Sequence, residues 1–304
     1  VNAVNDAPTI TSLSGDSLAY NEGDGAVVIE QGGNVLVADV DSTNFDTGIL
    51  TVSFTAGSDS AEDILSIRNQ GTGAGQIGVS GANVTYEGVT IGTFTGGSGG
   101  SNLVITLNSS ATPTAVTALV KNITYQNTDT NAPTTGARTV RYVLTDGDGG
   151  TSANYDTTVT VSGVNDDPII TSNGGGATSS TSVAENATAV TTVTSTDVDG
   201  GTPVYSIVPV GSGGAADAAL FSIDSNTGVL TFTTAPNYEA PTDSGGNNVY
   251  DVTVQVSDGN GGTDTQTLTV TVTNQAITSV SATGSTTALG GGVYTLNLGA
   301  NEHA

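Results

Sequence analysis

Alternating polar and apolar positions run through most of the sequence and predict strands rather than helices. The segments YDVTVQVS at 250–257 and TQTLTVTVT at 265–273 alternate with a period of two, and the turn DGNGG lies between them. This is the pattern of a β-hairpin. Residues 139–145 and 156–162 repeat the arrangement around DGDGG. We therefore predict an all-β fold, because many strands at short and regular spacing are typical of β-sandwiches.

Helical spacing is confined to short segments. In AVTALVK at 115–121, the apolar residues Val116, Leu119 and Val120 fall on one face of a helix, so we predict about two helical turns there. Residues 217–221 predict a single further turn. The rest of the chain is predicted to be strand or loop.

An internal repeat indicates the domain organisation. VNAVNDAPTITS at 1–12 returns as VSGVNDDPIITS at 161–172, with eight of the twelve positions identical. Each copy ends a strand rich in Thr and Val, passes through Asn-Asp-x-Pro and begins a new strand. A proline after a turn-forming pair fits an exit from one sheet and an entry into the next.

Two later landmarks follow each copy of the repeat. An Asp-Val-Asp triplet occurs at 39–41 and at 197–199, and an Asp-Gly turn begins at Asp146 and at Asp258. The first Asp of the triplet precedes the turn by 107 residues in the first case and by 61 in the second. We therefore predict that the first domain carries additional hairpins, inserted within residues 55–110.

These landmarks divide the chain into four predicted segments. The segments are a linker from a preceding domain at 1–6, an enlarged β-sandwich at 7–164, a second β-sandwich at 165–274, and the truncated start of a further β domain at 275–304. The last segment contains the strand-like runs ITSVSAT and VYTLNL.

The charge balance excludes several classes of partner. Acidic residues number 29 and basic residues four, which gives a formal net charge of −25. Such a surface repels nucleic acid and anionic membranes, and no apolar run reaches the ~18 residues of a membrane-spanning helix. Clustered carboxylates instead favour a hard cation, and calcium is the candidate. The alternative is that the charge serves solubility alone.

Residues for catalysis are scarce. The chain has one histidine, His303, and no cysteine, which argues against histidine-dependent triads and zinc sites. It has no tryptophan and 5% aromatic residues, which argues against a sugar-binding cleft. A G-x-G-x-x-G pattern at 73–78 is followed by a strand pattern and not by a helix, so dinucleotide binding is excluded. We predict that the chain is not an enzyme.

The order of the motifs in the second half resembles the cadherin family. AEN with Glu185, DVD at 197–199, FSIDSNTGVL at 221–230, PNYE ending in Glu239 and VSDGNGG with Asp258 follow one another in the family's order. The preceding VNDDP is similar to the cadherin linker motif, and the resemblance covers residues 161–274.

The wider composition adds two further resemblances. An acidic, Thr-rich and cysteine-free sequence is similar to the bacterial cadherin-like repeats of large adhesins. LVKNITYQNT followed by RTVRYVLTDGDGG in the first half is similar to chondroitin-sulfate-proteoglycan-type repeats, which are related modules.

These resemblances imply tandem cadherin-like (Ig-like Greek-key) β-sandwich domains in a linear array. The implied function is a calcium-stiffened, secreted, extracellular segment of a bacterial surface adhesin, with a role in cell adhesion or as a stalk. Its expected partners are neighbouring domains of the same long chain, other copies of itself, or a cell-surface or matrix ligand. A structural subunit of a surface layer, sheath or extracellular filament stays open as the alternative, with exposed strand edges pairing between copies.

The resemblance also implies a calcium site at the linker between the two domains. Calcium takes 6–8 oxygen ligands, which a junction can gather from several loops, and the crowded carboxylates would repel one another without a cation. The implied ligands are Asn165 and Asp166 from the linker, Asp197, Asp199 and Asp258 from the second domain, and Glu22 with Asn127 or Asp129 from the first. A second, partial set at the start of the chain comprises Asn5, Asp6, Asp39, Asp41 and Asp146.

Asn127 is included because of its spacing. It precedes Asp146 by 19 residues, as Glu239 precedes Asp258. For Asp148, Asn260 and Asp264 we favour ordinary turn chemistry over metal ligation.

The chain departs from the family pattern at both linkers. Gly163 stands where family linkers have an acidic residue, which predicts the loss or weakening of one ion. The next linker, VTNQA at 272–276, has Gln275 where an aspartate is expected. We therefore predict that Glu185 and Glu239 lack a full calcium site.

Overall fold

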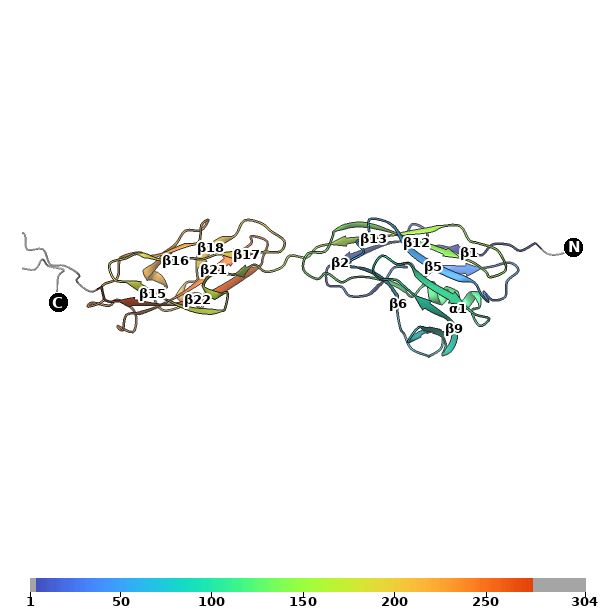
Figure 1. Cartoon of the computed structure of the whole chain (residues 1–304), viewed down its shortest axis with the longest axis horizontal. Coiled ribbons are helices and arrows are strands. Elements are labelled where there is room, and N and C mark those ends of the chain that lie inside the picture. The colour runs from blue at the N-terminus through green and yellow to red at the C-terminus, as the bar shows by residue number, and fades with distance from the viewer. Residues whose placement is uncertain (1–3, 276–304) are drawn as a thin grey trace, which may run out of the picture. The chain divides into compact units, whose positions relative to one another are not determined.

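The computed structural model describes residues 4–275 and divides after Asp166 into two compact units, called unit 1 and unit 2 (Figure 1). The strand-like runs of the predicted segment 275–304 lie outside the described residues. Both units are built from β-sheets, so the all-β prediction is confirmed. Among residues 4–275, no helix has the length and apolar content needed to cross a membrane.

Unit 1 has a large sheet, a small sheet and a strand pair. The large sheet has eight strands in the order β2-β13-β12-β5-β10-β9-β8-β7, the small sheet has the order β3-β11-β6, and β1 pairs with β4. Their bounds are β1 (Thr9–Thr11), β2 (Ser17–Asn21), β3 (Val27–Val28), β4 (Leu36–Ala38), β5 (Ile49–Ala56), β6 (Asp63–Ile67), β7 (Ile77–Ser80), β8 (Asn83–Tyr86), β9 (Val89–Thr95), β10 (Leu103–Leu107), β11 (Ile123–Asn127), β12 (Gly136–Leu144) and β13 (Tyr155–Ser162).

Unit 2 repeats the frame of unit 1 with fewer strands. Its sheets have the orders β15-β22-β21-β18 and β16-β20-β19, and β14 pairs with β17. The bounds are β14 (Ile169–Ile170), β15 (Thr178–Ala184), β16 (Ala189–Thr192), β17 (Ser195–Thr196), β18 (Val204–Ile207), β19 (Phe221–Ile223), β20 (Val229–Phe232), β21 (Val249–Ser257) and β22 (Thr263–Thr273). Three short 3-10 turns lie at Ser172–Gly174, Val210–Ser212 and Ala218–Leu220, and the last confirms the helical turn predicted at 217–221.

The alternation in the sequence becomes alternating burial. On β12 the inward residues Val140, Tyr142 and Leu144 are buried, and the residues between them are partly exposed. Strand β21 shows the same pattern in unit 2. Each large apolar side chain buried in this way stabilises the fold by about 1.5–3 kcal/mol, so each unit has a core of its own.

The additional residues of unit 1 lie between β6 and β11. They form β7 to β10 and the helix α1 (Pro113–Val120), and the strands extend the large sheet beyond β5. In Figure 1 this extension projects from the body of unit 1 near the label β9. Strands β7 to β10 lie within residues 55–110, where additional hairpins were predicted, and α1 follows them.

The helix begins two residues before the predicted start. Thr112 is its N-cap, with Oγ1 accepting a hydrogen bond from the Ala115 N–H at 3.3 Å, and Pro113 occupies the first turn. Both are common helix-start signals. Val116, Leu119 and Val120 are buried, as their spacing predicts.

The β7 edge of the large sheet is covered by amide side chains. Asn69 bonds to both the N–H and the carbonyl of Val79, and Gln70 Oε1 accepts from the Ile77 N–H. These bonds satisfy backbone groups of β7 inside the unit, so they blunt an edge at which another chain could otherwise pair.

Candidate metal centre

Five predicted ligands come together within unit 1. The Asn5 amide donates to Asp146 Oδ2 at 2.8 Å, the Asp6 N–H donates to Asp41 Oδ2 at 3.1 Å, and the Asp41 N–H donates to Asp39 Oδ1 at 3.1 Å. The linker, the Asp-Val-Asp loop and the Asp-Gly turn therefore meet at one end of this unit. That these residues bind calcium stays a prediction.

Backbone N–H groups of the turn after Asp146 stabilise its buried carboxylate. Asp146 is 1% exposed, and its Oδ1 accepts from the N–H groups of Asp148, Gly149 and Gly150. Burial raises the pKa of Asp146, but the bonds from Asn5 and these N–H groups outweigh it, so the pKa is lowered. At position 150 a Cβ would lie 2.2 Å from Asp146 Oδ2 and 2.9 Å from the Asp6 carbonyl oxygen, so only glycine fits.

Asp39 is the member of the set with an unused oxygen. Its Oδ2 is buried and has no hydrogen-bond partner among the described residues. Burial raises the pKa of Asp39, and the Asp41 carboxylate raises it further, although hydrogen bonds from the N–H groups of Asp41 and Ser42 act in the opposite direction. A buried, unpaired carboxylate oxygen is costly, and a bound cation would remove that cost. This end of unit 1 therefore fits a divalent ion.

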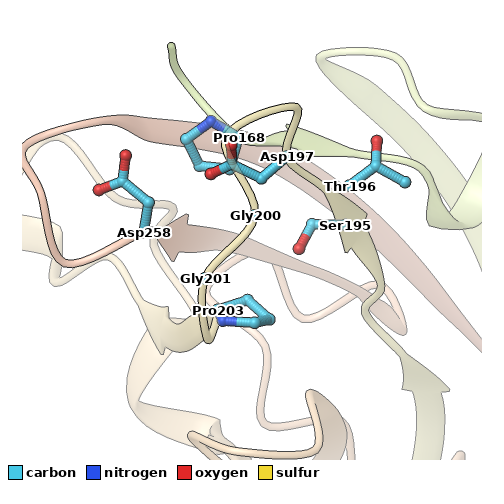
Figure 2. A pocket seen from close by; sticks show the side chains of 8 residues that line it. All are labelled: Pro168, Ser195, Thr196, Asp197, Gly200, Gly201, Pro203 and Asp258. Carbon is cyan, nitrogen blue, oxygen red and sulfur yellow. The ribbon is translucent and has the colours of Figure 1, made fainter. Parts of the chain in front are cut away.

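Unit 2 forms the same loops at its own N-terminal end. The Asp199 N–H donates to Asp197 Oδ1 at 2.9 Å, and Asp258 Oδ1 accepts from the N–H groups of residues 260–262. Figure 2 shows that Asp197, Asp258 and Pro168 line one hollow, whose volume is about 110 Å³. Asp197 and Asp258 are therefore brought together inside this unit.

The linker residues of the second set belong to the other unit. Asn165 and Asp166 are the last residues of unit 1, and the Asn165 amide donates to the Asp166 carbonyl at 3.0 Å. The next residue, Asp167, belongs to unit 2 and accepts from the Thr263 N–H at 3.2 Å. Because the predicted set is divided between the units, its convergence stays a prediction.

Glu22 and Glu185 hold the residues that follow each sandwich. The Glu22 N–H donates to the Ser162 carbonyl and its Oε2 accepts from the Val164 N–H at 2.8 Å. Glu185 repeats this contact, since its Oε1 accepts from the Gln275 N–H at 2.9 Å.

The second oxygen distinguishes the two glutamates. Glu185 Oε2 accepts from the Tyr238 N–H at 3.2 Å, whereas Glu22 Oε1 is buried without a hydrogen-bond partner among residues 4–275. In unit 1 the N–H of Thr128, in the loop after β11, donates instead to the Glu62 carbonyl. Glu22 thus keeps an oxygen for a cation, and Glu185 has both oxygens occupied by backbone N–H groups.

Asn127 and Asp129 lie in one turn but differ in exposure. Asn127 is buried, donates to Asp63 Oδ1 at 3.3 Å and accepts from the Asp129 N–H at 2.8 Å. Asp129 is partly exposed, and hydrogen bonds from the N–H groups of Asn131 and Ala132 lower its pKa.

Unit 2 forms the same type of turn, in which Asn237 accepts from the Glu239 N–H at 3.0 Å. By this turn the counterpart of Glu239 is Asp129, whereas the sequence spacing pairs Glu239 with Asn127. The difference arises because the loops from these turns to the Asp-Gly turns differ in length.

Sequence reasoning missed a buried charged cluster in unit 1. Arg138 is fully buried, with Nε 3.2 Å from Asp63 Oδ2 and Nη2 3.7 Å from Glu62 Oε1. The Tyr125 hydroxyl donates to Asp63 Oδ1, and burial and this carboxylate raise the pKa of Tyr125. The available signal was the inward position of Arg138, two residues before Val140 on β12.

Metal ligation here would need more than carboxylates. Within residues 4–275, no three Asp, Glu, His or Cys side chains form a cluster that could hold a metal ion by themselves. The predicted sets also use asparagine, whose amide oxygen calcium accepts. The residues of unit 1 that would hold calcium are Asn5, Asp6, Asp39, Asp41 and Asp146.

Comparison with known proteins identifies a family for part of the chain. Residues 179–273 match the cadherin domain model. Among curated proteins, none matches the sequence. Cadherin domains are non-enzymatic adhesion modules.

Solved structures with cadherin domains are similar at low identity. Protocadherin Gamma B2 extracellular cadherin domains 1-5 has 16% identity and a TM-score of 0.46, over 90% of this chain and 41% of that one. Human CDH23 EC21-23 has 14% identity and a TM-score of 0.42, over 88% and 70%. The protocadherin gammaB7 EC3-6 cis-dimer structure has 18% identity and a TM-score of 0.40, over 89% and 52%. The chain thus spans less than half the length of the first of these structures.

The family match lies within unit 2 and covers its strands from β15 to β22. Residues 179–273 are therefore similar in sequence to a cadherin domain, and the described residues of both units form all-β folds.

Proposed function

We propose that this chain is a calcium-stiffened extracellular repeat segment of a bacterial surface adhesin, which acts in cell adhesion or as a stalk. Its sandwiches at 7–164 and 165–274 are successive domains of a longer secreted chain, and 275–304 begins another. Calcium binds at the linker between the two sandwiches. The external partners are other copies of the chain or a cell-surface or matrix ligand.

One observation carries the proposal. In unit 1 the Asn-Asp linker, the Asp-Val-Asp loop and the Asp-Gly turn meet, and Asp39 Oδ2 is left buried without a partner. Unit 2 has the same Asp-Val-Asp and Asp-Gly loops, and Asn165 and Asp166 repeat the Asn-Asp pair. The repetition supports the same role for both sets.

At the linker the proposed ligands come from three sources. Asn165 and Asp166 supply oxygens from the linker itself. Asp197, Asp199 and Asp258 supply carboxylates from the second domain, and Glu22 with Asp129 or Asn127 supplies oxygens from the first. Bound calcium supplies the positive charge that offsets repulsion among these groups, at an affinity of about 10⁻⁴–10⁻³ M for extracellular modules.

Calcium titration with small-angle X-ray scattering tests the proposal on the 304-residue chain. We expect removal of calcium by a chelator to shorten the mean end-to-end distance, because the linker carboxylates then repel one another without a fixed geometry. Melting followed by circular dichroism should show a parallel loss of thermal stability.

The matched variants are Asp197→Asn with Asp199→Asn, and Asp224→Asn as the control. Asp224 is an exposed turn residue of unit 2 that accepts from the N–H groups of Asn226 and Thr227, outside both predicted sets. The double variant should lose both calcium responses, and the control should keep them. An unchanged calcium response in the double variant would refute the assignment.

A further inference from the structure

We propose that the strand pairs β2–β13 and β15–β22 are shear clamps, which carry tension along the chain and keep each unit folded under load. In both units the first long strand pairs in parallel with the last strand (Figure 1). The parallel pairing covers five residue pairs in unit 1 and seven in unit 2. All other strand pairs of the described residues are antiparallel, so this arrangement is confined to the strands nearest the two ends of each unit.

Parallel pairing decides how tension acts on these strands. The chain enters β15 at Thr178, which faces Thr267 on β22. It leaves β22 at Thr273, which faces Ala184 at the other end of the pair. A pull on both ends of the chain therefore slides one strand along the other and loads all the hydrogen bonds between them together. Two strands pulled apart from the same end would instead lose these bonds one at a time.

Backbone hydrogen bonds, rather than side-chain packing, hold β15 in place. Of its seven residues, which read TSSTSVA, only Val183 is buried. The Thr267 N–H donates to the Ala177 carbonyl at 2.9 Å. The Glu185 N–H donates to the Thr273 carbonyl at 3.0 Å. Because backbone groups point to alternate sides along a strand, the odd-numbered residues of β15 direct their N–H and carbonyl groups at β22, and the even-numbered residues direct theirs away from it.

The inserted strands of unit 1 lie outside the loaded region. In the eight-stranded sheet β2 and β13 lie at one edge and β7 lies at the other, so β7 to β10 carry no direct load while the clamp holds. The clamp of unit 1 encloses 146 residues, from Ser17 to Ser162, and that of unit 2 encloses 96, from Thr178 to Thr273. At ~3.3–3.6 Å per extended residue, opening lengthens the chain by about 500 Å in unit 1 and about 300 Å in unit 2. The insertion therefore stores length that is released only when the clamp of unit 1 fails.

The clamps are separate from the proposed calcium sites. None of the predicted calcium ligands belongs to β2, β13, β15 or β22. The role inferred here therefore goes beyond the proposed function, and it predicts the same behaviour with calcium and with a chelator.

Single-molecule pulling in two directions on the 304-residue chain tests the clamp of unit 2. The chain has no cysteine, so pairs of introduced cysteines give specific attachment points for the handles. Thr178→Cys with Thr273→Cys loads the pair in shear, whereas Thr178→Cys with Thr265→Cys peels it from one end. All three positions are exposed. Because forced unfolding is governed by the unfolding barrier, we expect a severalfold higher force in shear, and equal forces in the two directions would overturn the proposal.

Pulling the chain by its two ends tests the stored length. The protein should give one step of about 500 Å and one of about 300 Å, because the two clamps enclose different numbers of residues. Two steps of equal length would contradict the storage of the insertion behind the clamp of unit 1.

Proline substitutions in β15 supply a matched pair of variants. Thr181→Pro removes an N–H that is directed at β22, and Ser180→Pro removes one that is directed away from it, a position that sheet edges tolerate. Thr181→Pro should lower the force of the shorter step and leave the longer step unchanged, and Ser180→Pro should lower neither. Equal losses in both variants would show that strand distortion is responsible, and would overturn the proposal. If Thr181→Pro prevents unit 2 from folding, the comparison of the two pulling directions still decides, because it leaves the backbone of β15 intact.

Discussion

The C-terminal ends of the two units share a backbone device and differ in chemistry. In both, a glutamate that directly follows a strand, Glu22 after β2 and Glu185 after β15, accepts a hydrogen bond from a backbone N–H two residues past the unit's last strand. Glu22 accepts from Val164, and Glu185 accepts from Gln275. Beyond that contact, unit 1 has acidic loops and a buried arginine, and unit 2 has aromatic rings and an apolar hollow of about 290 Å³, lined in part by Pro236.

The comparison of the two ends shows that the fold determines where the chain leaves a unit, whereas the local side chains determine what can bind there. Glu22 keeps one buried oxygen without a hydrogen-bond partner in residues 4–275, so a cation can use it. Glu185 has no oxygen to spare, because the Tyr238 N–H occupies the second one. The contrast arises because one loop takes a different path in each unit. Its Thr128 N–H donates to the Glu62 carbonyl in unit 1, whereas its Tyr238 N–H donates to the Glu185 carboxylate in unit 2.

The largest expected effect tests the polar end of unit 1. Arg138→Met leaves Asp63 and Glu62 buried without their cation, and breaking one side of a buried ion pair costs about 3–5 kcal/mol. We expect the melting temperature of unit 1 to fall by about 10 °C in calorimetry. Unit 2 should melt as before, which provides an internal control.

The same pair offers a rescue. Adding Asp63→Asn to Arg138→Met removes the uncompensated charge and keeps an oxygen for the Tyr125 hydroxyl. The double variant should therefore be more stable than Arg138→Met alone. If the rescue fails and the single variant loses less than a degree, the charged cluster does not support this end of unit 1.

A smaller effect separates the two glutamates. Saturating calcium should stabilise the domain that binds it by about 1–3 kcal/mol at 10 mM calcium, given sites of about 10⁻⁴–10⁻³ M. Glu22→Gln should reduce this calcium-dependent rise in melting temperature, because it weakens a ligand with an unused oxygen. Glu185→Gln should leave the rise unchanged.

The strands and turns that surround the candidate site were easier to predict from the sequence than the long-range contacts within it. The Asp-Val-Asp and Asp-Gly turns were predictable because their hydrogen bonds are local: the Asp41 N–H donates to Asp39, and the Gly150 N–H donates to Asp146. Strand alternation likewise predicted β12 and β21, since it depends only on neighbours in the chain.

Long-range contacts were not predictable in the same way. The Asp63–Arg138 pair joins residues 75 positions apart, and no local pattern sets its partner. The path of the loop at Thr128, which leaves Glu22 Oε1 without a partner, depends on a bond to Glu62. Sequence spacing also paired Asn127 with Glu239, because the sequence alone does not show that the loops leading to the two Asp-Gly turns differ in length.

The pH dependence of unit 2 tests the backbone device itself. Hydrogen bonds from the N–H groups of Gln275 and Tyr238 lower the pKa of Glu185. A lowered carboxyl pKa contributes stability that is present above about pH 4.3, the unfolded value, and is lost as the pH falls through the folded value. Glu185→Gln should therefore give a shallower loss of melting temperature between pH 5 and pH 3, and an identical slope would contradict this role.

The smallest expected effect comes from placing an acid in the linker that follows unit 2. Gln275→Asp introduces the aspartate that the resemblance to cadherin linkers predicts, beside the occupied carboxylate of Glu185. Because both Glu185 oxygens already accept from backbone N–H groups and the adjoining hollow is apolar, the new acid should gain no calcium response. We expect the melting temperature of unit 2 to change by about a degree or less, with and without calcium. A calcium-dependent rise of several degrees would show instead that one aspartate is enough to convert an apolar end into a cation-binding one, and that linker sequence outweighs the hollow beside it.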